Sequence, residues 1–295
     1  LLPGDAGRGQ IPAYAYPEAA AAALARAAGY GAWRTGPRGV VPEFDDIDAG
    51  HARALIREFL RQTPDGGWLP ADQVAELLRC YGMAPTPLTE ACSEDDAVAA
   101  FGAVAAEAGQ PAPVVLKADV PGLVHKTDAG GVELDLRAAT DVRAAYRRLA
   151  ERFAGRLRRV LVQPMITDGT EVIVGVTDDH VFGPLVVFGL GGVATEVLAD
   201  HSARLTPLTD TDADTLIRSI RSAPLLLGHR GSPAADLGAL RTLLLRVARL
   251  ADDLPEITDL DLNPVIARPD GAFVVDARVK AVPYQPKDPF LRDLR

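Results

Sequence analysis

Segments with helical periodicity alternate with short apolar runs along most of this 295-residue chain. Near the N-terminus, an Ala-rich segment from Pro17 to Trp33 favours a helix, and a second helical stretch is predicted from about His51 to Arg61. The Pro-, Gly- and Asp-rich residues between them are typical of a connector. We therefore predict that the first fifth of the chain is an arm or linker without a core of its own.

A compact pattern begins near Trp68, where a predicted helix ends at Gly82. Another helix is predicted to begin at Ser93, because Asp96 three residues later completes a capping-box signature. The remaining elements predicted here are strands at 114–116, 132–136 and 160–162 and a helix at about 141–153. This order predicts a lobe of helices packed on a mostly antiparallel sheet.

The pattern restarts after Gln163, Pro164 and Met165, which indicates a second lobe. Its predicted elements are strands at 171–176 and 185–188, a Gly-rich turn, helices near 212–222 and 236–253, and a last strand pair around residues 268–271. The resulting fold class is α/β in the broad sense, more narrowly α+β, with two lobes at 67–164 and 165–285 and a tail at 286–295.

Composition narrows the class of protein. With 48% hydrophobic residues the chain can form a large core, and its net charge of −9 opposes attraction to nucleic acids and anionic membranes. No apolar run approaches the roughly 20 residues of a membrane-spanning helix, so we expect a soluble, cytoplasmic protein. Cys80 and Cys92 lack metal-ligand spacing and are interpreted as free thiols.

The last strand pair carries the most informative polar pattern. Alternation places Asp259, Asp261 and Asn263 on one face of a strand whose leucines point to the other face. The turn segment Arg268-Pro269-Asp270-Gly271 predicts a hairpin in which paired residue numbers sum to 539, so that Asn263 faces Asp276. A loop centred one residue later would shift the pairing by two and leave them diagonal neighbours.

Carboxylates crowded on one face repel each other unless a cation or a basic partner is present, and oxygen ligands suit magnesium. A hard metal ion bound with nucleotide phosphates is therefore one interpretation of this row. On spacing alone, an ordinary solvated strand face explains Asp259 and Asp261 equally well.

Lys117 follows the first buried strand of the N-terminal lobe and is one of only four lysines in the chain. A compact charge at that position is placed to meet phosphate, although a strand-end lysine reaching solvent is an equal alternative. Gly130 and Gly131 could admit phosphate close to the backbone, or could simply form a turn. The loop lacks a Walker A pattern, and no Rossmann glycine motif opens a helix.

His125 lies in the same loop and could accept or relay a phosphoryl group through an imidazole nitrogen. A lone surface histidine is the more common situation. The other four histidines show no ligand spacing, so we assign them no role.

Four ordered blocks carry a family resemblance: LKADVPGLVHKTDAGGVELDL, VLVQPMITDGTEVIVGVTDDHVFGPLVVFGLGGVATEVLAD, LLLGHRG and DLDLNPVIARPDGAFVVDARV. Together they resemble the ATP-grasp domain of NDP-forming, including ADP-forming, acyl-CoA synthetases, relatives of the succinyl-CoA synthetase beta chain. The resemblance runs from about Trp68 to Tyr284. It implies that the two lobes clasp a nucleotide, with an N-terminal lobe at 67–164 and a C-terminal lobe at 165–285.

Residues 1–66 resemble the tail of an upstream CoA-ligase domain followed by a linker, so the chain is expected to be part of a longer protein. The resemblance implies a partner domain or subunit that binds CoA and, through it, the acyl substrate. ATP or ADP and Mg²⁺ are the implied cofactors. The implied reaction converts an acid, CoA and ATP to acyl-CoA, ADP and phosphate through a phosphohistidine.

The resemblance also implies roles for single residues. Lys117 would contact nucleotide phosphates, and the segment from Gln163 to Met165 would be the interlobe adenine-binding strand. Asn263 and Asp276 would bind magnesium, with Asp261 close to it. The resemblance also places Gly130, Gly131 and Glu171 among the ATP-binding residues. It implies that His125 is a second phosphate-relay histidine and that Glu196 occupies a recurrent acidic position.

Two departures bear on turnover. Asp259 stands where a longer Glu is expected, and residues 119–122 differ from the Ser-Pro version associated with active synthetases. A second hypothesis is therefore a ligand-sensing, non-catalytic domain fused to a GNAT-type protein lysine acetyltransferase. A purely structural assembly domain is the third.

Overall fold

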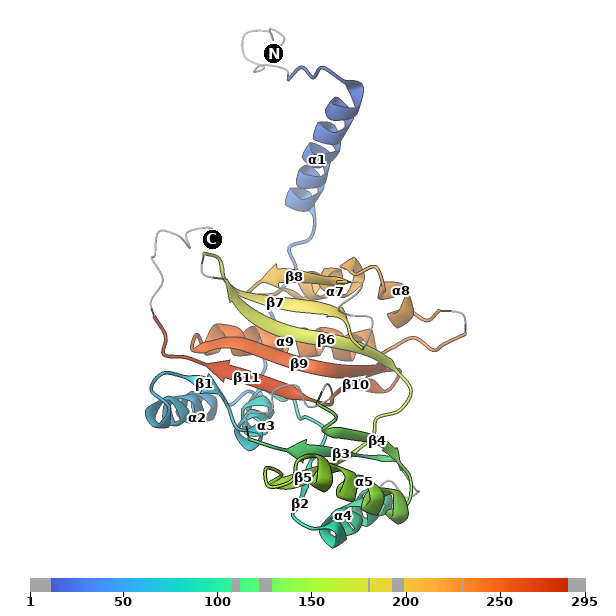
Figure 1. Cartoon of the computed structure of the whole chain (residues 1–295). Helices are drawn as coiled ribbons and strands as arrows, with labels where there is room; N and C mark the ends of the chain where they lie inside the picture. Colours follow the sequence, from blue (N-terminus) through green and yellow to red (C-terminus); the bar gives the residue numbers. More distant parts are fainter. Residues whose placement is uncertain are drawn as a thin grey trace. The chain divides into compact units, whose positions relative to one another are not determined.

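The computed structural model describes residues 12–107, 112–121, 129–179, 181–192, 199–229 and 231–285. The chain divides into two compact units, residues 1–40 and 41–295. In the first unit, helix α1 (Pro17–Thr35), drawn in blue in Figure 1, has no buried residue. Its Tyr30 and Trp33 rings have centroids 5.6 Å apart. The Ala-rich helix is thus confirmed.

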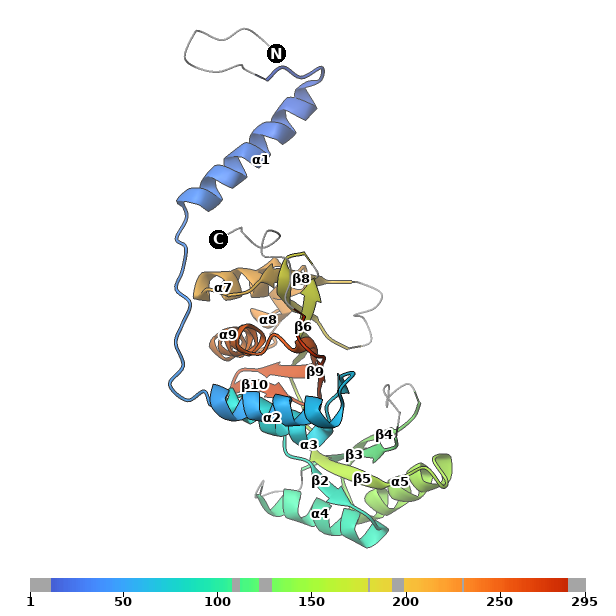
Figure 2. The same cartoon turned by 90° about the vertical axis from the view of Figure 1, so that its left-hand side faces the viewer.

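The larger sheet of the second unit is antiparallel throughout the pairings described. Its strands in spatial order are β1 (Gly67–Trp68), β11 (Ala277–Ala281), β9 (Ile257–Arg268), β6 (Thr170–Asp179), β7 (Gly183–Leu190) and β8 (His201–Leu205), with β10 (Gly271–Val274) also pairing with β9. Helices α7 (Asp210–Ser219), α8 (Ala223–Leu226) and α9 (Leu237–Asp253) cover one face (Figure 2). The opposite face is left for the polar rows of β9 and β11.

Helix α9 is the centre of the larger core. Its buried positions recur every three or four residues, as in Leu240, Leu244 and Val247, so one apolar stripe lies against the sheet. The side chain of Asp236 accepts a hydrogen bond from the Ala239 amide at 2.9 Å and caps the helix. This packing fixes which face of β9 is buried.

The smaller lobe is a four-stranded antiparallel sheet with two helices. Its strands in spatial order are β2 (Thr89–Ala91), β5 (Arg159–Pro164), β3 (Val114–Asp119) and β4 (Val132–Leu136), and its helices are α4 (Glu94–Glu107) and α5 (Ala139–Arg152). The two helices contact each other, and their buried residues share one core with the sheet. The Ser93 hydroxyl accepts a hydrogen bond from the Asp96 amide at 3.1 Å, which confirms the predicted helix start.

Alternation along β3 and β5 separates two faces of the small sheet. Val114 and Leu116 belong to the core beneath the helices, whereas Lys117 points to the other face. The register places Lys117 opposite Leu161 and Val115 opposite Gln163. Lys117 and Gln163 are therefore diagonal neighbours on the face away from the helices.

The predicted hairpin register is confirmed. Pairs from Gly271 with Arg268 to Lys280 with Asp259 keep one sum of residue numbers, and the Asn263 amide donates to the Asp276 carbonyl at 3.1 Å. Leu260 and Leu262 are buried in the larger core, while Asn263 is exposed. The two-lobed α+β arrangement follows the prediction as well.

Several boundaries differ from the prediction. Helix α2 (Ala49–Gln62) was expected in a coreless arm, yet its Ala52 and Ile56 lie in the larger core. Strand β1 and helix α3 (Ala71–Cys80) were assigned to the N-terminal lobe from residue 67, yet β1 pairs with β11 and α3 shares that larger core. An amphipathic pattern shows that a helix has an apolar face without showing which sheet covers it.

Strand lengths were also underestimated. Strand β3 continues to Asp119, so Lys117 lies within a strand rather than in the loop that follows it. The short strands β1, β2 and β8 were not predicted, since each depends on pairing with a distant segment. Among the described residues, no helix combines the length and apolar character needed to cross a membrane.

The core position of β9 can be tested with Leu262→Ala. Leu262 is 0% exposed, so the substitution should lower the free energy of unfolding by about 2–5 kcal/mol. Leu205→Ala, on edge strand β8 with Leu205 at 45% exposure, should cost less than about 1 kcal/mol. Urea unfolding followed by circular dichroism measures both, and equal losses would contradict the assigned burial.

Candidate functional site

At the boundary between the lobes, Lys117 of the smaller lobe contacts the hairpin that begins with β9. Lys117 is only 6% exposed, and its Nζ donates a hydrogen bond to the Val275 carbonyl at 3.2 Å. Val275 lies in the connection from β10 to β11 and directly precedes Asp276. The structure therefore brings Lys117 of the smaller lobe to the part of the larger lobe that carries Asp276.

A cavity of about 340 Å³ opens beside this contact, a size in the range of small-molecule sites. Lys117, Asp276 and Arg278 contribute charged groups to it. Its apolar lining comes from both lobes and includes Leu69, Val74, Val120 and Leu161. Two of the predicted site residues, Lys117 and Asp276, thus line one cavity, and the other predicted residues that the structure describes do not border it.

Gln163 makes a second connection between the lobes. Its side chain is fully buried, and its Nε2 donates to the carbonyls of Thr86 at 3.1 Å and of Val275 at 3.0 Å. Beside it, the Thr86 amide and hydroxyl both donate to the Val274 carbonyl, at 2.8 and 2.9 Å. Gln163 therefore holds the segment that enters the smaller lobe against the hairpin of the larger one.

Met165 follows strand β5 and is half-buried. Its amide donates to the Pro113 carbonyl at 2.9 Å and extends the pairing of β5 with β3. Because this donor is already used, a purine at the predicted adenine-binding strand would meet other atoms of the segment.

The predicted metal ligands are neighbours on the hairpin. Asn263 pairs with Asp276, whose Oδ1 accepts a hydrogen bond from the Ala277 amide at 3.1 Å. Asp261 lies directly opposite Arg278. These three ligands supply only oxygen donors, which suits a hard divalent cation. The described residues include no group of three or more His, Cys, Asp or Glu side chains placed to hold a metal ion.

Basic residues on β11 account for part of the acidic row on β9. Lys280 faces Asp259, with Nζ 3.9 Å from Oδ2, and the Thr258 hydroxyl donates to the same oxygen at 3.1 Å. Carboxylates crowded on one face need a cation or a basic partner. Lys280 is the basic partner of Asp259 and Arg278 lies opposite Asp261, so Asn263 and Asp276 are the favoured candidate metal ligands.

Gly130 and Gly131 lie just before β4. Gly130 has a φ of +65°, and an added Cβ would collide with the Arg152 guanidinium. The Gly131 carbonyl accepts a hydrogen bond from the Ala118 amide at 2.8 Å. Of the two alternatives for this glycine pair, phosphate contact or a turn, these contacts support the turn. They also bring Arg152 close to the loop that was predicted to meet phosphate.

Glu171 is exposed at the start of β6, where its carbonyl accepts a hydrogen bond from the Gly191 amide at 2.8 Å. A Cβ added to Gly192 would lie 3.1 Å from Glu171 Oε2, so this side chain leans over the Gly-rich segment. The predicted residues His125 and Glu196 lie outside the described residues.

Sequence reasoning missed two charged neighbours of the site and one side-chain role. Arg278 could have been found, because the predicted register already placed residue 278 opposite Asp261. Arg152 comes from the end of α5 and gave no local signal. The lobe-crossing bonds of the Gln163 side chain depend on a fold that joins Thr86 to Val275.

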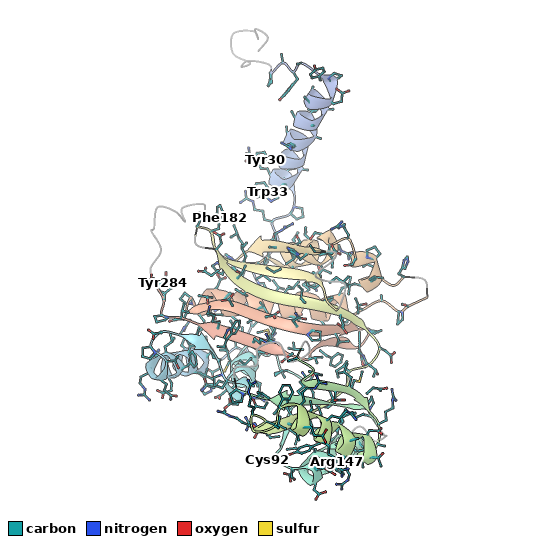
Figure 3. The ribbon with its side chains drawn as sticks, viewed as in Figure 1. Tyr30, Trp33, Cys92, Arg147, Phe182 and Tyr284 are labelled. Carbon is teal, nitrogen blue, oxygen red and sulfur yellow. The ribbon has the colours of Figure 1, made fainter. Side chains whose placement is uncertain are left out.

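A larger hollow of about 890 Å³ lies elsewhere, between the end of α9 and the turn joining β6 to β7. Tyr284 borders it, and Phe182 projects from the same turn (Figure 3). Two of its acidic residues have partners: Asp253 accepts a hydrogen bond from Arg249 at 2.8 Å, and Asp252 accepts one from Thr206 at 2.7 Å. Within the described parts of the chain, none of the predicted site residues lines this hollow, so size alone does not locate the site.

Asp200 anchors the chain after the Gly-rich segment. It is 7% exposed, and its carboxylate accepts hydrogen bonds from the Arg221 and Ser222 amides, each at 2.7 Å. Burial disfavours the charged form, but hydrogen bonds from Ser222 and the Arg221 amide outweigh it, so the pKa of Asp200 lies below its ordinary value of 3.8.

Comparison with known proteins identifies relatives of this arrangement. The ATP-grasp domain family matches residues 61–281. The beta subunit of an ADP-forming acetate–CoA ligase I from Pyrococcus furiosus is 38% identical over 212 residues, covering 70% of this chain and 89% of the relative. The single-chain ADP-forming acetate–CoA ligase I of Archaeoglobus fulgidus is 36% identical over 241 residues, covering 80% of this chain and 34% of the relative.

A solved structure agrees with these matches. The acetyl-coenzyme A synthetase 1 of Ca. Korarchaeum cryptofilum, in complex with coenzyme A and Mg-AMPPCP, is similar with a TM-score of 0.64 and 36% identity. The match covers 79% of this chain and all of that one. These relatives confirm the expected ATP-grasp fold and acid–CoA ligase family, and they give no support to the acetyltransferase-linked sensor.

The chain spans most of the Pyrococcus beta subunit but about a third of the single-chain ligase. The similarity therefore concerns the nucleotide-binding part of such enzymes.

The lowered pKa of Asp200 predicts a pH-dependent stability. A carboxyl group whose folded pKa is depressed stabilises the fold fully above its unfolded pKa, and that stabilisation is lost as pH falls through the folded pKa. Asp200→Asn should therefore lower the free energy of unfolding by about 1–3 kcal/mol above about pH 5, and by less as the pH approaches 3.5.

Urea unfolding between pH 3.5 and 7 measures this difference. Asp214→Asn is the matched control, since the half-exposed Asp214 pairs with Arg241 at 3.3 Å and should contribute less than about 1 kcal/mol. A deficit for Asp200→Asn that stays constant over the pH range would contradict the prediction.

Proposed function

Because the chain belongs to the ATP-grasp family, we propose that it is the Mg-ATP-binding part of an ADP-forming acyl-CoA synthetase. The observation that supports this best is the contact of Lys117 with Val275, next to Asp276 and beside a cavity between the lobes. A lysine from one lobe and a carboxylate from the other are the types of group that bind a nucleotide phosphate and its metal ion, which supports the proposal.

In this proposal Lys117 binds the phosphates, and the segment from Gln163 to Met165 lies along the adenine. Asn263 and Asp276 hold the magnesium ion, with Asp261 near it. When bound, magnesium would neutralise the charge of the transferring phosphate. The ammonium of Lys117, whose side chain is only 6% exposed, contributes a further positive charge.

The loop and the acidic positions have supporting roles in the proposal. Gly130 and Gly131 shape the turn beside the phosphates, Glu171 lies at the Gly-rich segment, and His125 relays the phosphoryl group. The complete reaction joins an acid to CoA while ATP becomes ADP and phosphate. Because the chain spans only part of the single-chain relative, a CoA-binding domain or subunit is the proposed partner, through which CoA and the acyl substrate enter.

Calorimetry with Mg-ATP tests the proposal. The wild-type chain should bind, whereas Lys117→Ala and Asp276→Asn should each weaken binding by about tenfold or more, because each removes a charged contact to the phosphates or to the metal.

Two matched controls separate these contacts from general charge effects. Lys280→Ala removes a half-exposed lysine from the same face of the hairpin, and Asp270→Asn changes an exposed carboxylate at its turn. Both should leave affinity within about threefold. Absence of Mg-ATP binding by the wild-type chain would rule the proposal out.

A further inference from the structure

Gln163 is fully buried at 0% exposure, less exposed than the neighbouring Lys117 at 6%. It lies on the face of the small sheet that also carries Lys117, opposite Val115. Its amide group bonds to carbonyls from two distant parts of the chain, Thr86 before β2 and Val275 in the hairpin. Its side chain therefore joins the smaller lobe to the metal-binding hairpin proposed above.

The chemistry of this contact requires a neutral group with two donors. Two carbonyl oxygens face Nε2, so the amide orientation is fixed, because the opposite orientation would place Oε1 against both of them. A carboxylate would repel the same oxygens, and an apolar side chain would leave them without this donor. Glutamine fits this requirement.

The Val275 carbonyl is shared. It accepts from Gln163 Nε2 at 3.0 Å and from Lys117 Nζ at 3.2 Å. A carbonyl oxygen has two lone pairs, so it can bind both donors at once. This oxygen is thus one of the groups that hold the Lys117 ammonium, and it lies one residue before Asp276.

The amide oxygen of Gln163 indicates a role for this residue beyond stability. Gln163 Oε1 is buried and has no hydrogen-bond partner among the described residues. An unpaired buried acceptor is costly. Leaving Oε1 unpaired is explained if Nε2 of the same amide must lie where it can donate to the Thr86 and Val275 carbonyls.

We propose that Gln163 is a positioning residue that fixes the Val275 carbonyl and thereby holds the Lys117 ammonium beside Asp276. The importance of that placement for nucleotide binding rests on the proposed function. The placement itself can be measured without nucleotide.

The first experiment measures the reactivity of Lys117 toward an amine-directed acylating reagent, read by peptide mass spectrometry. The chain has only four lysines, so each can be followed separately, and the half-exposed Lys280 is the internal standard. In Gln163→Met, the lobes lose this connection, and Lys117 should react at least about fivefold faster relative to Lys280.

Val115→Ala is the matched control. Val115 is 5% exposed on the same face and opposite Gln163, so its truncation disturbs packing without removing a hydrogen bond to Val275. Lys117 reactivity should then stay within about twofold of wild type. An unchanged Lys117 rate in Gln163→Met, or an equal rise in both variants, would overturn the inference. General unfolding would be recognised by a simultaneous rise at Lys280.

The second experiment is a double-mutant cycle on Mg-ATP affinity. Gln163→Met should raise the Kd about tenfold in the wild-type background and less than about twofold in the Lys117→Ala background, because its effect acts through Lys117. Equal, additive losses would overturn the inference. If the wild-type chain does not bind Mg-ATP, the proposed function fails, and the labelling experiment alone decides the placement.

Discussion

The register between β9 and the strands that follow it governs both the core and the candidate site. In a strand, neighbouring side chains point to opposite faces, so one shift by a single residue would exchange the buried and the exposed rows. In the observed register Leu260, Leu262 and Val279 are buried together, and Asn263 and Asp276 pair at the open side. The same hydrogen bonds that close the larger core therefore place the proposed metal ligands.

That dependence explains what could be predicted from the sequence. The hairpin register followed from local turn chemistry and alternation, which involve residues close in the chain. The placement of β1 and α3 could not follow, because β1 pairs with β11 more than 200 residues away. Their assignment to the smaller lobe was wrong for that reason. The candidate residues on the hairpin and in β3 were identifiable, but the contact of Lys117 with Val275 needed the two lobes in place.

Basic residues on the open face of the larger sheet alter the interpretation of Asp259 and Asp261 on β9. Seen in sequence, Asp259 and Asp261 suggested carboxylates without partners. In the structure each lies opposite a basic residue of β11, Lys280 and Arg278. Exposed pairs of this kind contribute little to stability, but they leave less negative charge for a cation to neutralise. Asn263 and Asp276 are therefore the ligands that the geometry favours.

The connection through Thr86 has a further meaning for the architecture. The larger sheet contains strands from before residue 70 and after residue 169, so the smaller lobe is an insertion within it. The hydrogen bond from Gln163 to the Thr86 carbonyl, at 3.1 Å, joins the start and the end of that insertion. Inserted domains whose ends lie close together can be accommodated without breaking the host fold. The larger lobe is thus one continuous fold, and the smaller lobe, which has its own core, is inserted into it at a single position along the chain.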